Sequence, residues 1–197
     1  SKQQAKEKLG VNDGRKLIVS FWGSLGSNAM NRAMADFLAL ESAKEPFHHI
    51  HGVGEICWSS MQQWLSDDSV DLSAHPALQV REYIYDMAAV MRAADLVICR
   101  AGASTLSELT ALGVPAILVP SPNVTNHHQE KNAALLGDHG AALVLAEEGL
   151  DGKKLFAAAA GLLRDDARMA RMADSMAQLG IRDATERIYR TVMALVK

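Results

Sequence analysis

The chain has 197 residues, of which 49% are hydrophobic and 22% charged, with a formal net charge of −3 at neutral pH. This size and composition predict one globular domain with a substantial buried core, and the small net charge gives no reason to expect nucleic acid as a partner. The two cysteines, Cys57 and Cys99, lie in apolar surroundings without a metal-ligand spacing, so we expect buried thiols and no metal site.

Strands alternate with helices along most of the chain, after a charged, helix-prone segment at residues 2–9. The predicted strands are residues 16–21, 48–54, 77–83, 96–99, 116–119 and 141–145. The predicted helices between them are residues 31–40, 55–65, 86–93, 104–112 and 129–136. From residue 151 onward the sequence predicts helix alone, with stops at residues 165–166 and at Gly180.

This alternation predicts an α/β fold with a Rossmann-like, doubly wound parallel sheet and helices on both faces. The continuous apolar runs LVIC (96–99) and AILV (116–119) are typical of strands covered on both sides. No internal repeat is visible, so residues 1–197 are predicted to form a single domain, of which residues 151–197 are a C-terminal helical segment. Ligands of such folds bind at the carboxyl ends of the strands.

The segment DLVICRAGASTLSE (95–108) has the form strand, tight turn, helix start. Unpaired backbone N–H groups at a helix N-terminus attract phosphate. Glu108 lies one turn into this helix, where a carboxylate would repel phosphate but could accept hydrogen bonds from the paired hydroxyls of a ribose. Phosphate donors beside a ribose-binding acid indicate a nucleotide site.

Two further segments could contribute to that site. The glycine-rich turn after the first strand, WGSLGSN (22–28), has the same local form, but two glycines also occur in turns that only pack closely. His127, His128 and Gln129 open a helix and could bind a sugar or be a solvated cap. His48, His49 and His51 lie on a predicted strand, where a structural role is favoured over metal binding.

The segments GSLGSNAMN (23–31), YIYDMAAVMRAADLVICRAGASTLSELTALGVPAILVP (83–120) and NHHQEKNA (126–133) together resemble the C-terminal half of the MurG family. These are glycosyltransferases of family 28 with the GT-B fold, in which two Rossmann-like domains face each other across a cleft. The resemblance extends over essentially the whole chain. It implies that this chain is one half of such an enzyme, the half that binds UDP-N-acetylglucosamine (UDP-GlcNAc).

The resemblance also implies roles for particular residues. Ser24 would contact the donor phosphates, Ile84 would meet the uracil through its backbone, and Glu108 would bind the ribose hydroxyls. Gln129 would bind the GlcNAc hydroxyls, and His128 stands where many relatives have glutamine. The complete set implied for UDP-GlcNAc is Ser24, Ile84, Arg100, Gly102, Ala103, Ser104, Thr105, Glu108, His128 and Gln129.

The implied reaction is inverting transfer of GlcNAc to the C4 hydroxyl of undecaprenyl-pyrophosphoryl-MurNAc-pentapeptide, which converts lipid I to lipid II without a metal clamp or cofactor. In the family, the general base, the lipid acceptor and the contact with the membrane belong to an N-terminal domain that this chain lacks. We therefore expect the chain to bind donor without turnover, and the whole protein to lie on the cytoplasmic face of the bacterial plasma membrane. The absence of an initial methionine favours a piece of a longer protein.

Three alternatives stay open on the sequence. The chain could be the non-catalytic donor-binding subunit of a split GlcNAc-transferase. It could belong to a related transferase with another lipid acceptor, since the acceptor is chosen by the absent half. It could also be half of a UDP-GlcNAc epimerase on the same fold, although the NHHQEKN segment fits the transferase pattern better.

Overall fold

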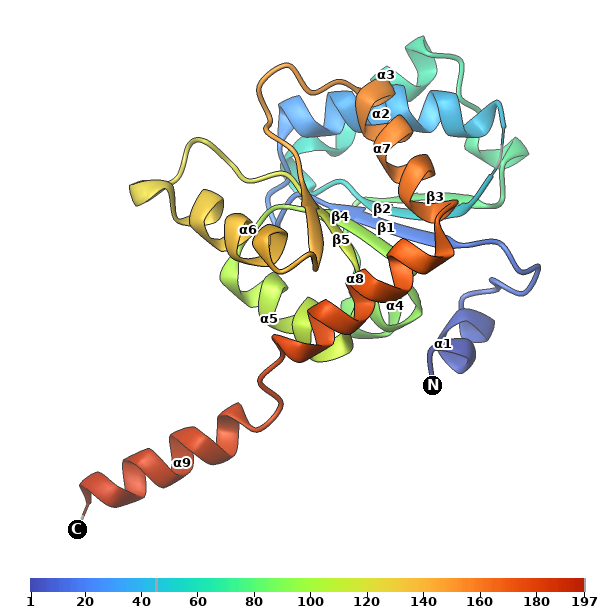
Figure 1. The fold of residues 1–197 in the computed structure, drawn as a ribbon. Helices are drawn as coiled ribbons and strands as arrows, with labels where there is room; N and C mark the ends of the chain where they lie inside the picture. Colours follow the sequence, from blue (N-terminus) through green and yellow to red (C-terminus); the bar gives the residue numbers. More distant parts are fainter. Residues whose placement is uncertain (45, 197) are drawn as a thin grey trace.

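The computed structural model describes residues 1–44 and 46–196, and its centre is a six-stranded sheet (Figure 1). In spatial order the strands are β3 (Leu78–Arg81), β2 (His48–Gly52), β1 (Leu17–Phe21), β4 (Leu96–Cys99), β5 (Ala116–Leu118) and β6 (Ala142–Val144). Each neighbouring pair is parallel. The chain reverses its direction of travel across the sheet between β1 and β4, and this confirms the predicted doubly wound, Rossmann-like fold.

Helices cover both faces of the sheet (Figure 1). One face carries α2 (Asn28–Ser42), α3 (Trp58–Asp67) and α7 (Gly152–Leu163). The other carries α1 (Lys2–Lys8), α4 (Met87–Ala93), α5 (Ala103–Leu112) and α6 (His128–Asp138). Helix α8 (Asp166–Gln178) contacts both α7 and α5 and so joins the two layers. Short 3-10 turns complete the order at η1 (Glu55–Cys57), η2 (Leu72–Ala74) and η3 (Thr125–His127).

The apolar runs of the sequence become central strands because both of their faces are buried. In β1, Leu17 and Val19 pack into the core beneath α4 and α5, whereas Ile18 between them packs into the core beneath α2 and α7. The same division separates Val97 from Ile98 in β4. Successive side chains of a strand point to opposite faces of the sheet. Where all of them are apolar, the sheet has a hydrophobic core on each face.

The observed bounds of the helices and strands differ from the predicted ones at two places near the carboxyl ends of the strands, where the sequence predicts the ligand. Helix α2 begins at Asn28, three residues earlier than predicted, because the glycine turn is shorter than the sequence pattern suggested. Strand β3 ends at Arg81, and residues 82–85 leave the sheet instead of extending the strand to residue 83. Those residues are thereby free to line a cavity.

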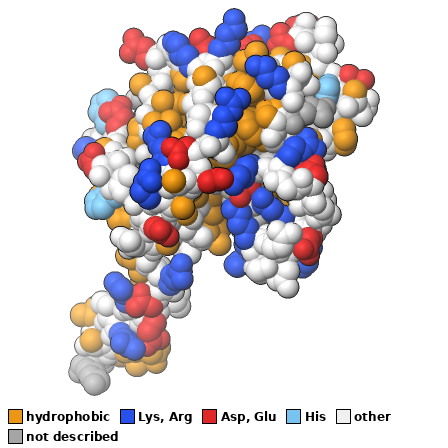
Figure 2. Space-filling model, turned by 45° about the vertical axis from the view of Figure 1, so that its right-hand side comes forward, with side chains coloured by type: hydrophobic (Ala, Val, Ile, Leu, Met, Phe, Trp, Pro, Cys, Tyr) orange, Lys and Arg blue, Asp and Glu red, His pale blue; other side chains and the backbone are white. Residues whose placement is uncertain are grey.

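The last helix, α9 (Ala184–Leu195), protrudes from the rest of the chain (Figure 1). None of its residues is buried, and it carries both apolar and charged side chains on its surface (Figure 2). Its exposed apolar residues include Ile188, Tyr189 and Val192. In the described part of the chain, every helix is too short or too polar to cross a membrane.

Helix α1 is tied to the sheet through Asp95, which precedes β4. Its carboxylate pairs with Lys2 at 2.7 Å and Lys6 at 2.5 Å, and it accepts a hydrogen bond from the backbone N–H of Leu17 at 2.8 Å. Burial alone would raise the pKa of Asp95, but the lysine and backbone hydrogen bonds outweigh it and hold the pKa below the ordinary 3.8. The ionised form is therefore stabilised by folding.

We expect Asp95→Asn to lower the free energy of unfolding by about 2 kcal/mol at neutral pH, the usual worth of hydrogen bonds to a charged group. Because the folded pKa of Asp95 is depressed, its contribution is present above the unfolded pKa and is lost as pH falls through the lower folded pKa. The difference between wild type and variant should thus shrink below pH 3.8. Urea unfolding measured from acidic to neutral pH tests this. Asp166→Asn is the control, since its pair with Lys16 is exposed.

Candidate nucleotide-binding site

Two glycine-containing loops meet at the carboxyl ends of β1 and β2. Gly26 and Gly54 have φ values of +81° and +89°, which side-chain-bearing residues rarely adopt. A Cβ on Gly26 would lie 2.3 Å from the carbonyl oxygen of Val53, and one on Gly54 would lie 2.5 Å from the backbone nitrogen of Gly26. The two loops are thus in direct backbone contact, and both positions require glycine.

A cavity of about 310 Å³ opens beside these loops. Its wall is formed by the last residues of β1 and β2, by the loops that follow β1, β2 and β3, and by the N-terminal parts of α4 and α5. The lining residues are Phe21, Gly23, Ser24, Gly52, Gly54, Glu82, Tyr83, Ile84, Met87, Ser104, Thr105 and Glu108. This is the point at which the strand order reverses, where ligands of doubly wound folds bind.

The N-terminus of α5 points its free backbone donors toward this cavity. Gly102 is the N-cap residue and supplies no side chain to cap the helix, and the first turn contains no acidic residue. The first helical hydrogen bond runs from Leu106 N to Gly102 O at 3.0 Å, so the N–H groups of Ala103, Ser104 and Thr105 have no partner within the helix. These donors and the helix dipole favour an anion here.

Glu108 adds a carboxylate to the same cavity, one turn beyond Ser104. Its side chain is exposed, and within residues 1–44 and 46–196 it has neither an ion-pair partner nor a hydrogen-bond donor. A free carboxylate at this distance from the helix N-terminus can accept hydrogen bonds from a neutral hydroxylated group while the helix end holds an anion. The arrangement suits adjoining sugar and phosphate groups.

The apolar wall of the cavity comes from the segment after β3. Ile84 is buried, and a Cβ on Gly52 would lie 3.0 Å from its Cδ1 atom, so the two residues pack closely. Tyr83 and Tyr85 lie beside it with their ring centroids 5.0 Å apart. Met87 completes this side from the first turn of α4. A flat base could lie against this wall, next to the backbone polar groups of residues 82–84.

The predicted site residues fall into two groups. Ser24, Ile84, Ser104, Thr105 and Glu108 all line the cavity, and Gly102 and Ala103 form the start of the helix that faces it. Arg100, His128 and Gln129 do not line it. Gly52, Gly54 and Glu82 also line the cavity, although no sequence motif singled them out: Gly52 is the last residue of β2, and Gly54 and Glu82 follow β2 and β3. Their sequence signal was their place near the carboxyl ends of predicted strands.

Arg100 is occupied by contacts within the protein. Its guanidinium pairs with Glu147 at 2.5 Å and donates to the carbonyl of Val119 and the hydroxyl of Ser27, both at 3.1 Å. It also lies over the ring of Trp22, 5.9 Å from the centroid. Arg100 therefore joins the first glycine loop to the loop after β6.

His128 and Gln129 are the first two residues of α6, outside the cavity. The Nδ1 atom of His128 is 2.9 Å from the carbonyl of Thr125, and Oε1 of Gln129 accepts a hydrogen bond from Ser121 N at 2.9 Å. Asn132, one turn further, donates to the carbonyl of Ala101 at 3.1 Å and so ties α6 to the turn before α5. Among the described residues, the side-chain amide nitrogen of Gln129 has no hydrogen-bond acceptor, so it remains available as a donor.

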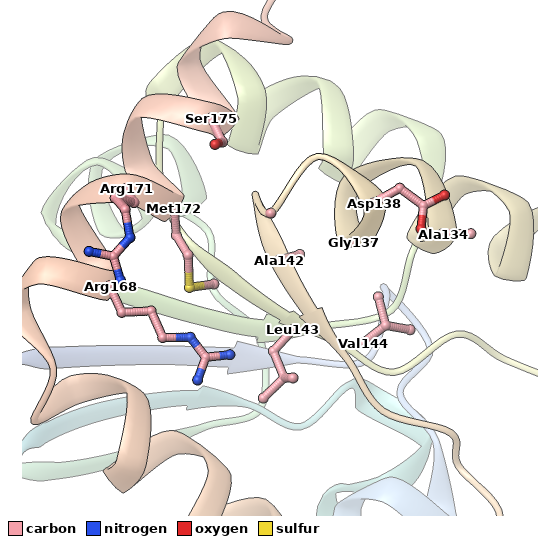
Figure 3. A pocket seen from close by; sticks show the side chains of 11 residues that line it. Ala134, Gly137, Asp138, Ala142, Leu143, Val144, Arg168, Arg171, Met172 and Ser175 are labelled. Atoms are coloured by element: carbon pink, nitrogen blue, oxygen red, sulfur yellow. The ribbon is translucent and has the colours of Figure 1, made fainter.

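A second, larger cavity of about 790 Å³ lies between α6, β6 and α8 (Figure 3). Arg168 and Met172 project from α8 toward Leu143 of the edge strand, and Arg171 lines the cavity from the same helix (Figure 3). Among the described residues that line it, those of α8 follow a capped helix start, where Asp165 accepts a hydrogen bond from Arg168 N. It lacks the phosphate-binding features of the smaller cavity, so size alone does not mark the site. In the described residues, no three His, Cys, Asp or Glu side chains are grouped to hold a metal ion.

A doubly wound sheet with an uncapped helix N-terminus and a free carboxylate at its switch point defines a Rossmann-like α/β domain of the nucleotide-binding kind. The sequence model of the glycosyltransferase family 28 C-terminal domain matches residues 17–188. The chain therefore belongs to this family.

The relatives agree with that family. The chain is 39% identical over 197 residues to the UDP-N-acetylglucosamine–N-acetylmuramyl-(pentapeptide) pyrophosphoryl-undecaprenol N-acetylglucosamine transferase of Acetivibrio thermocellus, covering all of this chain and 52% of that protein. The crystal structure of Acinetobacter baumannii MurG matches with a TM-score of 0.79 at 28% identity, over 98% of this chain and 53% of that one. The chain thus spans about half the length of the curated relatives it matches.

A UDP-GlcNAc 2-epimerase from Neisseria meningitidis, bound to UDP-GlcNAc, has the same fold with a TM-score of 0.66. Its identity to this chain is 15%, with 98% of this chain and 48% of that one covered. A likeness at that level shows the shared architecture alone. The identities of 34–39% are to transferases, so the epimerase alternative is not favoured.

Proposed function

We propose that this chain is the UDP-GlcNAc-binding half of an inverting glycosyltransferase that transfers GlcNAc to the C4 hydroxyl of lipid I to form lipid II. The observation that carries the proposal is the pairing, in one cavity, of the free N-terminus of α5 with the unpaired carboxylate of Glu108. Membership of glycosyltransferase family 28 and the names of the relatives supply the sugar and the acceptor.

In this proposal the donor lies along the rim from β3 to α6. The uracil rests near Ile84 and meets backbone groups there, the ribose hydroxyls donate to Glu108, and the pyrophosphate sits on the N–H groups of residues 103–105 with Ser24 opposite. The GlcNAc ring reaches the start of α6, where the amide of Gln129 and the ring of His128 contact its hydroxyls. Arg100 does not contact the donor in this proposal. It holds the first glycine loop in place through its ion pair with Glu147 and its hydrogen bond to Ser27.

The cavity would act chiefly on the leaving group. Transfer releases UDP as an anion while the sugar passes through an oxocarbenium-like transition state. Fixed N–H donors and the dipole of α5 would stabilise the negative charge that develops on the pyrophosphate, and they need no reorganisation as the reaction proceeds. The residues that line the cavity require neither a cofactor nor an Asp-rich metal clamp for this role.

The remaining parts of the reaction belong to a second domain. We propose that the general base, the binding of the undecaprenyl-linked acceptor and the attachment to the cytoplasmic face of the plasma membrane come from an N-terminal domain; this chain covers only 52% of the Acetivibrio thermocellus relative. A general base must lie within hydrogen-bond reach of the acceptor hydroxyl. The 197 residues alone are then expected to bind donor without transferring it.

Calorimetric titration of the chain with UDP-GlcNAc tests the proposal. We expect saturable binding at one site, weaker binding of UDP-glucose, and displacement of UDP-GlcNAc by UDP. Arg171→Ala, which alters the larger cavity at α8, is the control and should leave the affinity unchanged. If Arg171→Ala abolishes the binding, the ligand lies in the larger cavity at α8 and the proposal is wrong. The absence of binding to either nucleotide sugar would also contradict the proposal.

A further inference from the structure

Five polar side chains are fully buried between β1, β2 and α2, although the surrounding core is apolar. They are Ser20, Asn31, Glu41, His49 and His51, each with no exposed surface. None of them lines the cavity, and the donor-binding roles proposed above use none of them. Burying polar groups is costly unless their hydrogen bonds are made, so the arrangement of these bonds is informative.

The side chains form one continuous chain of hydrogen bonds. Glu41 Oε2 lies 2.6 Å from His49 Nδ1, and His49 Nε2 lies 2.7 Å from the hydroxyl of Ser20. That hydroxyl lies 2.7 Å from His51 Nδ1, and His51 Nε2 lies 3.0 Å from Asn31 Oδ1. The register that places Ser20 beside His51 in the β1–β2 pairing makes these contacts possible.

This series of hydrogen bonds ends at a loop that lines the cavity. Asn31 Nδ2 donates to the carbonyl of Val53 at 2.9 Å, just after β2. That carbonyl is the atom that a Cβ on Gly26 would meet at 2.3 Å, and Asn31 Nδ2 itself lies 3.3 Å from the same Cβ position. Asn31 therefore sits where the loop carrying Ser24 touches the loop carrying Gly54, and both of these residues line the cavity.

The hydrogen bond from Asn31 to Val53 determines which group donates in each of the other hydrogen bonds. Because the amide of Asn31 donates to Val53, its Oδ1 atom accepts, and His51 Nε2 must be the donor. Burial is the main cause that lowers the pKa of His51 to about 3, so the ring is neutral at physiological pH; with the proton on Nε2, its Nδ1 accepts from the Ser20 hydroxyl. Ser20 in turn accepts from His49. Each of these hydrogen bonds fixes the orientation of the next side chain, and the last one fixes the Asn31 amide that donates to Val53.

We propose that Asn31 and His51 are positioning residues that hold the two glycine loops in contact and thereby set the affinity of the cavity for the donor pyrophosphate. This inference rests on the proposed function. The loops have no other side-chain tie at this junction among the described residues, apart from a long contact of 4.0 Å between Cys57 Sγ and the carbonyl of Leu25. His51 acts through Asn31, because it fixes the amide in the orientation that donates to Val53.

The test compares variants of the chain that differ in the hydrogen bond but share a loss of core volume. Asn31→Ala removes the tie to Val53. Leu38→Ala, on the same helix and equally buried, creates a cavity without touching the loops and is the matched control. We expect the dissociation constant of UDP to rise about tenfold in Asn31→Ala, as for a lost hydrogen bond of ordinary strength, and to change less than about twofold in Leu38→Ala.

His51 provides a second pair of variants that retains the loop residue itself. Glutamine can accept from Ser20 and donate to Asn31, whereas leucine can do neither. We expect His51→Leu to weaken UDP binding and His51→Gln to restore it, at matched unfolding temperatures. If His51→Leu and His51→Gln bind UDP equally well, or if Asn31→Ala binds as tightly as the wild type, the inference is wrong.

Amide hydrogen exchange tests the contact between the loops without a ligand. The N–H of Gly54 donates to Glu82 O at 2.9 Å and that of Gly26 to Gly23 O at 3.3 Å, so both report on these loops. We expect Asn31→Ala to accelerate exchange at both glycines more than Leu38→Ala does, and equal acceleration would overturn the inference. Failure of the wild type to bind UDP, with the exchange difference present, would instead contradict the proposed function.

Discussion

Glu108→Ala is expected to weaken UDP-GlcNAc binding by about 10- to 100-fold, the effect of losing hydrogen bonds to a charged acceptor worth about 1.5–3 kcal/mol. The side chain is exposed and has no ion-pair partner among the described residues, so its removal leaves the fold intact. Stability and binding should therefore separate. Calorimetry with UDP-GlcNAc and thermal unfolding of the same sample measure the two effects.

Two comparisons locate the lost interaction at the ribose. Glu130→Ala removes an exposed acid at the start of α6, outside the cavity, where it pairs with His127, and should leave the affinity unchanged. The 2′-deoxy analogue of UDP should bind the wild type less tightly than UDP, but bind Glu108→Ala as tightly as UDP does. If the penalty of the 2′-deoxy group persists in Glu108→Ala, the carboxylate does not contact that hydroxyl.

The fold was predictable because its strands carry their own signals. The runs at residues 96–99 and 116–119 are apolar at successive positions, and Gly113 stops the helix between them with a φ of +68°. The parts of the site that follow β1 and β4 were predictable for the same reason, because in each a glycine turn stands directly before a helix. Ser24, Ser104, Thr105 and Glu108, which belong to these two segments, do line one cavity, and their contacts with the donor stay predictions.

The rest of the site depends on contacts that the sequence does not encode locally. The loops after β2 and β3 carry no phosphate-binding pattern, and only the strand order brings Gly54 and Glu82 to the cavity. Arg100 was expected at the donor, but Glu147, 47 residues further along, pairs with it. The alternation of side chains along a strand puts His49 and His51 on one face of β2, but their hydrogen-bond partners follow from strand register and helix packing.

Ser104→Asp is expected to change binding and stability in opposite directions. Ser104 lies in the first turn of α5, and a carboxylate there would stabilise the helix by about 0.3–1 kcal/mol through its dipole. The same charge would lie within about 5 Å of the pyrophosphate, where repulsion at an effective dielectric constant near 20 amounts to about 3 kcal/mol for each pair of charges. UDP binding should fall by about 100-fold or more while the unfolding temperature rises slightly.

Ser107→Asp is the matched control for that experiment. Ser107 is exposed on the same helix, donates to the carbonyl of Ala103, and does not line the cavity. Its added charge is farther from the helix N-terminus and is screened by solvent and salt, so UDP affinity should fall only a few-fold. If both variants lose UDP binding equally, a general effect of negative charge on α5 would explain the loss. If Ser104→Asp binds UDP normally, the pyrophosphate does not sit on this helix, and the proposed orientation of the donor must be abandoned.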